Sequence, residues 1–441
     1  MSQTSVSTTQ TSVSTTQTVH PAHNLIGSVR LPGDKSISHR YAMLAGIAEG
    51  ASTLSNFSSG ADPHSSLACM VALGATVTKN ADGTITVNGT AGDFQQPKGP
   101  LDCGNSGSTM RMLAGLIAPH PNIFTLVGDE SLTVRPMERI RKPLMQMGAR
   151  IDLTEGHAPM TIHGGPLRAI DFDTPIPSAQ VKTAILFAGL QAKGTTTIGE
   201  GVRTRDHSEH ALRAFGGEIT RTATSISITG GQRLRAANLA VPGDMSSAAF
   251  FLCAALLFPD SNLVLDDVGM NPTRAALLDV LVGLGLKIKV LNLEEHHGEL
   301  VGTLQINSSA QLKGAEVTGA LSAQLIDELP VLAAIAPYTR DGIRIRDAKE
   351  LRVKESDRIA LVAKNLTAMG AEFTEFEDGL EIPGGQTLHG AAIDSGLDHR
   401  IAMAFSIAAL RATSACEIHG ADAAAISFPE FYALLDSLAE R

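Results

Sequence analysis

The stretch LGATVTKNADGTITVNG (residues 73–89) joins an apolar run to two short segments in which apolar and polar residues alternate. A glycine follows the apolar run, and the polar turn NADG (80–83) separates the two alternating segments. Alternation with a period of two is typical of β-strands with one buried face, and Asp-Gly favours a tight turn. The stretch therefore predicts a helix end, a glycine turn and a two-stranded hairpin.

This pattern recurs about every 70 residues, as expected for one supersecondary unit used several times. It returns as MGARIDLTEGHAPMTIHG (147–164), FGGEITRTATSISITG (215–230), LGLKIKV…GTLQINS (284–308) and MGAEFTEFEDGLEIPGG (369–385). At that period, a chain of 441 residues holds about six such units.

Five further segments have the composition of buried helices, because apolar residues occupy nearly every side of a helix drawn through them. They are residues 37–50, 108–118, 179–192, 246–258 and 399–410. Helices this apolar are expected inside the fold, wrapped by sheets. The sequence therefore predicts an α/β protein of two pseudo-symmetric lobes with three units each, and a functional site in the cleft between the lobes.

The composition limits the possible partners. The formal net charge of −10 argues against a general nucleic-acid binder, which would need a broad basic surface. A local cluster of arginine and lysine can still oppose the global sign and bind a small anion. No run of about 18 apolar residues lacks charges and Gly/Pro breaks, so no membrane-spanning helix is expected. The 4 cysteines form no CxxC pair, which is typical of reduced thiols in a cytoplasmic protein.

The N-terminus is a polar low-complexity sequence in which TSVSTTQ occurs at 4–10 and again at 11–17. Such a sequence has little to bury, and we expect a disordered tail over residues 1–23. A plastid transit peptide would also be rich in serine, but it would be rich in arginine as well. The first basic residue is Arg30, so a dispensable tail is the favoured interpretation.

The segment PGDKSISHR (32–40) places Lys35, Ser36 and Arg40 just after a Pro-Gly turn. It does not meet the P-loop pattern, because Asp34 precedes the lysine where that motif has glycine. A helix that begins near Ser36 would still offer its backbone amides and positive dipole end to a phosphate. A capped helix with solvated basic residues is the alternative that this segment leaves open.

Two other segments favour anion binding. In GNSGSTMR (104–111), glycines before a helix allow close approach of the backbone to a ligand. Arg135 precedes a proline, so an extended or turn backbone holds its guanidinium, which can clamp a carboxylate or phosphate. Arg139 and Arg141 are interpreted as surface charges. His207 and His210 could hold a metal, but no clear set of partner ligands accompanies them.

Candidate acids and bases lie in the second half of the chain. Asp327 lies among apolar residues in IDELP (326–330), and Glu355 lies beside Lys354 in LRVKESDR (351–358). A carboxylate beside cations can serve as an acid or a base, tuned by its neighbours. Lys354, Glu355 and Arg358 are expected on a helix-like segment, and an exposed salt-bridged helix is the alternative.

Ten segments, taken in order, resemble the 5-enolpyruvylshikimate-3-phosphate synthase family of enolpyruvyl transferases. They are PGDKSISHR, GNSGSTMR, RPM, PSAQVK, TRDHSE, VPGDMSSAAF, IDELP, LRVKESDR, DHRIAM and SFPEF. The resemblance covers the chain from about residue 24 to the C-terminus. It implies a two-lobed inside-out α/β barrel, each lobe with three βαβαββ units, helices inside and sheets outside. One lobe, at 34–242, is expected to be inserted into the other, at 24–33 and 243–441.

The family resemblance also implies the reaction, which is that of a 3-phosphoshikimate 1-carboxyvinyltransferase. The enolpyruvyl group of phosphoenolpyruvate passes to the 5-hydroxyl of shikimate 3-phosphate, and phosphate is released. Both substrates are multiply anionic, which gives the clustered cations a purpose. The resemblance implies no metal or organic cofactor, a monomer, and inhibition by glyphosate at the phosphoenolpyruvate site.

Carried over residue by residue, the resemblance implies two binding sites that share Lys35. The shikimate 3-phosphate site comprises Lys35, Ser36, Arg40, Ser178, Ala179, Gln180, Arg205, Asp327 and Lys354. The phosphoenolpyruvate site comprises Lys35, Gly107, Arg135, Gln180, Arg358 and Arg400. Asp327 resembles the base for the 5-hydroxyl proton, Glu355 resembles the acid that protonates the methylene carbon, and Lys35 is the third expected catalytic residue.

The sequence departs from the family at two positions. Ile426 stands where many members carry lysine, so one phosphate contact is absent or is supplied by another residue. Ala179 stands where others have a second serine. Gly107 is retained where glyphosate-tolerant members carry alanine. Two rival interpretations are a UDP-N-acetylglucosamine enolpyruvyltransferase, whose loop cysteine is absent from 131–136, and a non-catalytic phospholigand-binding protein, which could lose Asp327 or Glu355.

Overall fold

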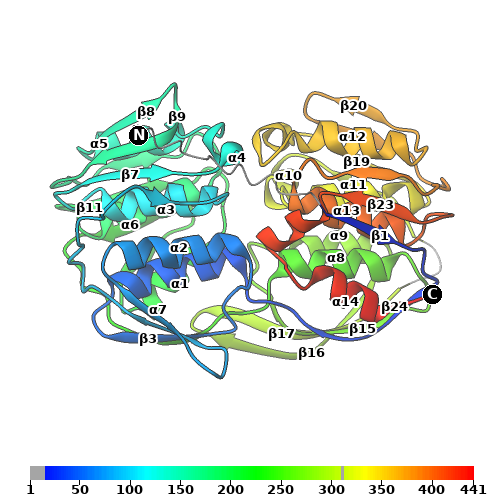
Figure 1. The fold of residues 1–441 in the computed structure, drawn as a ribbon, viewed down its shortest axis with the longest axis horizontal. Helices are drawn as coiled ribbons and strands as arrows, with labels where there is room; N and C mark the ends of the chain where they lie inside the picture. Colours follow the sequence, from blue (N-terminus) through cyan, green and yellow to red (C-terminus); the bar gives the residue numbers. More distant parts are fainter. Residues whose placement is uncertain (1–14, 309–311) are drawn as a thin grey trace, which may run out of the picture.

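The protein is a mixed α/β structure of two lobes that lie side by side (Figure 1), in a computed structural model that describes residues 15–308 and 312–441. Each lobe has its own hydrophobic core. The buried residues of one core all come from 37–241, and those of the other come from 19–31 and 245–438. We call the first the inserted lobe and the second the outer lobe.

Three four-stranded sheets form the inserted lobe, and all have the same strand order. In space they run β14 (Asn238–Ala240), β3 (Ala51–Ser55), β5 (Ile85–Asn88), β4 (Thr76–Lys79); β6 (Leu101–Asp102), β7 (Ile123–Val127), β9 (His157–His163), β8 (Arg150–Thr154); and β10 (Asp171–Asp173), β11 (Thr195–Gly199), β13 (Ser225–Thr229), β12 (Ile219–Arg221). In each sheet the first two strands are parallel, and the hairpin expected from the repeat supplies the last two.

The outer lobe repeats this plan with two changes. Its strands are β16 (Lys287–His296), β17 (Glu299–Asn307), β15 (Asn262–Gly269), β2 (Asn24–Arg30), β24 (Ala439–Glu440); β18 (Ala315–Val317), β19 (Ile343–Ile345), β21 (Gly379–Ile382), β20 (Thr374–Phe376); and β22 (Ala392–Asp394), β23 (Cys416–His419), β1 (Thr16–Val19). The first of these sheets gains β24 as a fifth strand. The last has three strands, because its unit ends in a helix and contributes no hairpin.

The helices form an inner and an outer set. The inner helices are α1 (Lys35–Ile47), α3 (Gly107–Ile117), α6 (Ala179–Gly189), α8 (Met245–Leu256), α11 (Leu329–Ile335) and α13 (His399–Ala409), and nearly all their residues are buried. The others are α2 (Ala61–Ala72), α4 (Glu130–Thr133), α5 (Glu138–Gln146), α7 (His207–Ala214), α9 (Ala276–Leu284), α10 (Ala320–Gln324), α12 (Arg358–Ala368) and α14 (Phe431–Leu438). All five helices expected to be buried belong to the inner set.

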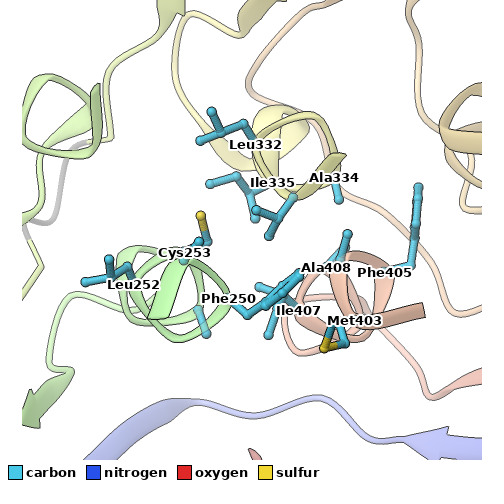
Figure 2. Close-up of a cluster of buried hydrophobic side chains, with 14 of the residues drawn as sticks. Phe250, Leu252, Cys253, Leu332, Ala334, Ile335, Met403, Phe405, Ile407 and Ala408 are labelled. Atoms are coloured by element: carbon cyan, nitrogen blue, oxygen red, sulfur yellow. The ribbon is translucent and has the colours of Figure 1, made fainter. Parts of the chain in front are cut away.

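Side chains from three inner helices fill the centre of the outer lobe (Figure 2). Phe250 of α8 and Phe405 of α13 are fully buried there together with Ile335 of α11. Apolar residues lie on nearly every side of these helices, so their sides are covered by the core. Polar contacts are therefore made mainly at the helix ends. No helix within residues 15–308 and 312–441 combines the length and hydropathy that a bilayer crossing requires.

The chain crosses between the lobes twice, through the related segments PGDK (32–35) and PGDM (242–245). The two crossovers are hydrogen-bonded to each other: the Asp34 amide lies 2.7 Å from the Pro242 carbonyl, and the Asp244 amide lies 3.0 Å from the Pro32 carbonyl. Gly33 is required here, because a Cβ at this position would lie 1.8 Å from the carbonyl oxygen of Asn56. The crossovers therefore hold the two lobes at one shared edge.

The expected disordered tail is wrong for the part that the structure describes. Residues 1–14 lie outside the described residues, but Thr16–Val19 form β1, which pairs antiparallel with β23. Strand β23 would otherwise have an open edge, since its unit supplies no hairpin. The threonine and valine in TQTV suit a strand, and the partner lies about 400 residues away, so local sequence gives no hint of it.

Candidate active site

A cavity of about 330 Å³ lies between the lobes, with residues of both in its lining. Eleven arginine and lysine side chains line it, against six aspartates and glutamates. The cations are Lys35, Arg40, Arg111, Arg135, Arg139, Arg203, Arg205, Arg274, Lys354, Arg358 and Arg400, and the carboxylates are Asp62, Asp244, Asp327, Asp347, Glu350 and Glu355. The cavity is thus locally cationic in a chain whose formal net charge is −10, and it is suited to small anions.

The N-terminal ends of inner helices from both lobes reach this cavity. The first residues of α1, α3, α6 and α13 are in its lining. The side chains of Asp34, Ser106, Ser178 and Asp398 cap these four helices by accepting a backbone N–H of the first turn. Because a helix carries partial positive charge at its N-terminus, the convergence of these ends adds to the attraction for anions.

All fourteen residues that the family resemblance assigned to the two binding sites and to catalysis lie in the lining of this one cavity. They are Lys35, Ser36, Arg40, Gly107, Arg135, Ser178, Ala179, Gln180, Arg205, Asp327, Lys354, Glu355, Arg358 and Arg400. They come from segments spread over more than 360 residues, which the fold brings together at the ends of inner helices and in the loops beside them.

Asp327 is surrounded by cations. Its Oδ2 accepts a hydrogen bond from Arg205 Nη2 at 2.6 Å across the cleft, and its Oδ1 lies 3.6 Å from Lys354 Nζ. Burial alone would raise the pKa of Asp327, but the charges of Lys354, Arg205 and two further arginines hold it well below its ordinary range. Asp327 is therefore ionised, and in this state it can accept a proton from a bound hydroxyl group.

Glu355 lies between arginines of both lobes. Arg358 Nη2 donates to its Oε2 at 2.6 Å, and Arg135 Nη1 of the inserted lobe donates to its Oε1 at 3.2 Å. Burial would raise the pKa of Glu355, but the charges of Arg358, Arg135 and further cations hold it well below its ordinary range. Arg358 is fixed in turn by Asp398, whose Oδ2 lies 2.8 Å from its Nε.

Two further clusters define the inserted-lobe side of the cavity. Arg40 is buried and donates to Ser208 Oγ at 2.7 Å and to Thr183 Oγ1 at 3.0 Å, and burial lowers its pKa to about 10. Gln180 accepts a hydrogen bond from Arg111 Nη1 at 2.7 Å. Gly107 leaves space beside these cations, since a Cβ there would lie 3.1 Å from Arg111 Nη1 and 3.3 Å from Arg135 Nη1.

Sequence reasoning missed several residues of the lining. Asp62 lies 3.0 Å from Lys35 Nζ, and Arg111 is the last residue of a motif already singled out. His399 was within DHRIAM, and burial together with the charges of Lys35 and Arg400 lowers its pKa well below the ordinary range. The positions of Arg111 and His399 inside recognised motifs were a signal that could have found them. Nothing local in the sequence indicates Asp62.

Two local expectations are corrected. Arg139 is not an isolated surface charge: it lines the cavity and pairs with Glu350 of the outer lobe. Lys354 and Glu355 are not on a helix, because the 3-10 turn Lys349–Val353 ends before them and α12 begins at Arg358. Asp357 caps α12 by accepting the Ala360 amide at 3.0 Å, which fixes where the helix starts.

Ile426, which departs from the family pattern, is not in the cavity lining. It ends the 3-10 turn Ala421–Ile426. The next residue, Ser427, is hydrogen-bonded to Nδ1 of His399, which does line the cavity.

Comparisons with known proteins agree over nearly the whole chain. A sequence model of EPSP synthase (3-phosphoshikimate 1-carboxyvinyltransferase) matches residues 19–435. A 3-phosphoshikimate 1-carboxyvinyltransferase of Koribacter versatilis is 59% identical over 423 residues, covering 96% of this chain and 99% of the relative. A protein of the same name from Bacillus velezensis is 44% identical over 422 residues, covering 95% and 98%.

Solved structures give the same result. EPSP synthase from Acinetobacter baumannii superposes with a TM-score of 0.85 at 39% identity, over 96% of this chain and 98% of that one. The enolpyruvyl transferase NikO from Streptomyces tendae shares the fold alone, with a TM-score of 0.77 at 18% identity, over 96% of both chains. With one sequence model across residues 19–435 and relatives this similar, the chain belongs to the EPSP synthase family.

Proposed function

We propose that this protein transfers the enolpyruvyl group of phosphoenolpyruvate to the 5-hydroxyl of shikimate 3-phosphate and releases phosphate. The observation that supports this most directly is the pair Asp327 and Glu355, two carboxylates in one cationic cavity, with Arg205 on the first, Arg135 on the second and Arg358 within reach of both. A binding protein for phosphorylated ligands would need the cations but not the two carboxylates.

The substrates divide the cations between them. Arg40, Ser36, Ser178 and Arg205 bind shikimate 3-phosphate, with Ala179, Gln180 and Lys354 completing that site. Gly107, Arg135, Gln180, Arg358 and Arg400 surround phosphoenolpyruvate. Lys35 at the start of α1 contacts both substrates. The cations pair with side chains of the cavity, among them Arg205 with Asp327 and Arg135 with Glu355, and substrate oxygens can replace these partners.

The reaction proceeds by addition and elimination. In the addition, the oxygen of the 5-hydroxyl group attacks C2 of phosphoenolpyruvate while Asp327 accepts the hydroxyl proton. Glu355 gives a proton to the C3 methylene carbon in the same step. In the elimination the roles reverse: the Glu355 carboxylate takes a proton from C3, the C2–O bond to phosphate breaks, and phosphate departs with the proton that Asp327 had accepted. The arginines stabilise the phosphate and carboxylate of the tetrahedral intermediate between these steps.

Substrate binding changes the protonation of Glu355. Burial would raise the pKa of Glu355, but the charges of Arg358 and Arg135 hold it well below the ordinary range, and an ionised glutamate cannot donate a proton. Both arginines also belong to the proposed phosphoenolpyruvate site. When substrate oxygens engage them, their stabilisation of the Glu355 carboxylate weakens, and burial then raises its pKa towards the range of a useful acid.

We also infer the finer organisation of the protein. Each lobe is an inside-out α/β barrel of βαβαββ units, a view supported by the shared strand order and the buried inner helices. The lobes correspond to 34–242 and to 24–33 with 243–441. The enzyme is a cytoplasmic monomer that needs no cofactor, and glyphosate inhibits it by occupying the phosphoenolpyruvate site.

The test is release of phosphate when purified protein is mixed with shikimate 3-phosphate and phosphoenolpyruvate. Release is expected only when both substrates are present. Omission of either substrate is one control, and replacement of shikimate 3-phosphate by UDP-N-acetylglucosamine is the other. Release with the nucleotide sugar alone as acceptor, or no release at all, would refute the proposal.

A further inference from the structure

Four buried polar side chains form a closed ring that joins the two lobes. Asp206 and His207 come from the inserted lobe, and Asn271 and Glu299 come from the outer lobe. Asn271 Nδ2 lies 2.8 Å from Asp206 Oδ1 and 2.8 Å from Glu299 Oε2. His207 Nδ1 lies 2.7 Å from Glu299 Oε1, and the chain itself joins Asp206 to His207. We call these four residues the interlobe ring.

The orientation of Asn271 is fixed by its own loop. Its Oδ1 accepts hydrogen bonds from the Thr273 amide at 2.9 Å and from Thr273 Oγ1 at 2.7 Å. Both protons of its Nδ2 are therefore available for the two carboxylates. Asn271 thus donates one hydrogen bond to Asp206 of the inserted lobe and one to Glu299 of the outer lobe. An apolar side chain could make neither bond.

The interlobe ring is cut off from solvent. Its members are between 2% and 5% exposed, so water cannot replace a lost partner unless the lobes separate. Burial alone would raise the pKa of Glu299, but the charge of His207 and hydrogen bonds from His207 and Asn271 lower it. Glu299 is thus ionised in the ring, and an ionised buried group without partners is strongly unfavourable.

The ring lies near the crossovers and extends them. Burial alone would raise the pKa of Asp34 in the first crossover, but the charge of Arg274 lowers it. The charge of His207 lowers it further, by a smaller amount than Arg274. Glu299 begins β17, whose hairpin with β16 runs along the lower edge of the molecule towards the inserted lobe (Figure 1). Gly298 of that hairpin is packed so closely on His210 that a Cβ would lie 2.3 Å from its Nδ1.

The segment that supplies the inserted-lobe half of the ring also carries Arg205. Arg205 immediately precedes Asp206, and its Nη2 lies 2.6 Å from Asp327 Oδ2 of the outer lobe. On the other side of the ring residues, Ser208 Oγ accepts from Arg40 Nε at 2.7 Å. Successive side chains of this segment thus have separate fixed partners, so the segment cannot slide without breaking several buried bonds.

We propose that the four members of the interlobe ring are positioning residues which hold Arg205 in register with Asp327. Breaking the ring would leave buried charges without partners, so it fixes the segment that carries Arg205 against the outer lobe. This inference rests on the proposed role of Arg205 in binding shikimate 3-phosphate. The ring acts through Arg205 and touches no substrate itself.

The test compares Asn271→Ala with the matched control Asn365→Ala. Asn365 is an equally buried amide whose Nδ2 lies 2.8 Å from the Asp394 carbonyl, entirely within the outer lobe. Three quantities are measured for each full-length variant: the Kd for shikimate 3-phosphate by calorimetry, the two KM values, and the midpoint of thermal unfolding. Asn271→Ala is expected to weaken shikimate 3-phosphate binding at least tenfold and to leave the KM for phosphoenolpyruvate within about threefold. Asn365→Ala is expected to change only the midpoint.

A second pair of variants covers the case in which Asn271→Ala does not fold. His207→Gln keeps an N–H donor for Glu299 and should retain most of the affinity, whereas His207→Leu should lose it. Equal affinity for shikimate 3-phosphate in wild type, Asn271→Ala and His207→Leu would overturn the inference, as would an equal loss in Asn365→Ala. If instead the wild type neither binds shikimate 3-phosphate nor releases phosphate, the proposed function itself is refuted. That outcome differs from failure of the ring inference, in which the wild type is active and the ring variants bind as tightly as it does.

Discussion

Arg139 Nη1 and Glu350 Oε1 lie 2.7 Å apart at the partly exposed edge of the cavity, and they belong to opposite lobes. The pair therefore exists only while the cleft is closed at this edge. It differs from the interlobe ring in exposure, since the Glu350 side chain is 37% exposed and water can replace its partner. A contact of this kind can break and form in each catalytic cycle.

This exposed pair is expected to contribute weakly to closure. In a double-mutant cycle of Arg139→Ala and Glu350→Gln, the coupling in kcat/KM should be about 0.2–1 kcal/mol, because exposed ion pairs are screened by water. The coupling should shrink between 50 mM and 500 mM salt. A parallel cycle on Arg150 and Asp152, which lie 3.8 Å apart on one strand, should give no coupling in kcat/KM. A coupling that does not respond to salt would contradict this account.

Replacing Asp327 by asparagine should separate binding from turnover. The shape is kept, but the amide cannot accept the hydroxyl proton, so kcat should fall by about 10²–10⁴-fold. Calorimetry should still detect shikimate 3-phosphate binding, because Arg40 and the helix N-termini remain. Asp341→Asn, at a surface ion pair with Arg340, is the control and should leave kcat unchanged. Unchanged turnover in Asp327→Asn would remove this residue from the mechanism.

The lowered pKa of Glu355 predicts a pH-dependent contribution to stability. A carboxyl whose folded pKa lies below its unfolded value stabilises the fold above the ordinary carboxyl range, and this stabilisation is lost as the pH falls through the folded pKa. Glu355→Gln should therefore unfold more easily than wild type at pH 7, since Arg135 and Arg358 lose their counterion. Chemical denaturation at a series of pH values should show the full difference above the ordinary carboxyl pKa of about 4.3 and a progressive loss as the pH falls below it. A difference already lost at pH 5 would contradict the lowered pKa.

Gly107→Ala should affect phosphoenolpyruvate and glyphosate more than shikimate 3-phosphate. The new methyl group would lie within 3.3 Å of Arg135 Nη1 and closer to Arg111, so these guanidinium groups must shift. We expect a higher KM for phosphoenolpyruvate and a larger rise in the inhibition constant for glyphosate. Steady-state inhibition kinetics test this. In the wild type, a glyphosate inhibition constant in the millimolar range would contradict binding at this site.

Two truncations test the role of β1. Removal of residues 1–14 leaves β1 intact, whereas removal of residues 1–19 deletes the strand that pairs with β23. The second truncation should lower the midpoint of thermal unfolding relative to the first, because an edge of the last sheet loses its hydrogen bonds and Val19 is removed from the core. Equal midpoints would mean that β1 contributes nothing to stability.

The repeat was predictable because its signals are local. The hairpin expected at 73–89 is formed by β4 and β5. The helix expected at 399–410 is α13, which spans His399–Ala409 and has Leu410 at its C-cap position. Glycine turns, strand alternation and apolar helices each depend on neighbours within a few residues. The fourteen site residues could be chosen because the motifs that hold them resemble one enzyme family, whereas local signals alone favoured anion binding only near Lys35, Gly107 and Arg135.

The remaining features depend on partners far apart in the chain. Nothing near Arg139 in the sequence indicates Glu350, and nothing near TQTV indicates β23. The interlobe ring joins residues 206 and 207 to 271 and 299 only where the two lobes are in contact. The loop at Lys354 is a different case: Asp357 is an N-cap residue visible in the sequence, and it places the start of the helix after Lys354 and Glu355.

The paired crossovers give the inserted lobe neighbouring ends, since the Asp34 amide lies 2.7 Å from the Pro242 carbonyl. Its first sheet is completed by β14, the last strand before the chain leaves, so this lobe keeps its strand set when considered alone. In the outer lobe, β2 reaches its parallel neighbour β15 only after the whole excursion. Excision of the inserted lobe would thus leave residues 33 and 243 close enough to be joined by a direct peptide connection.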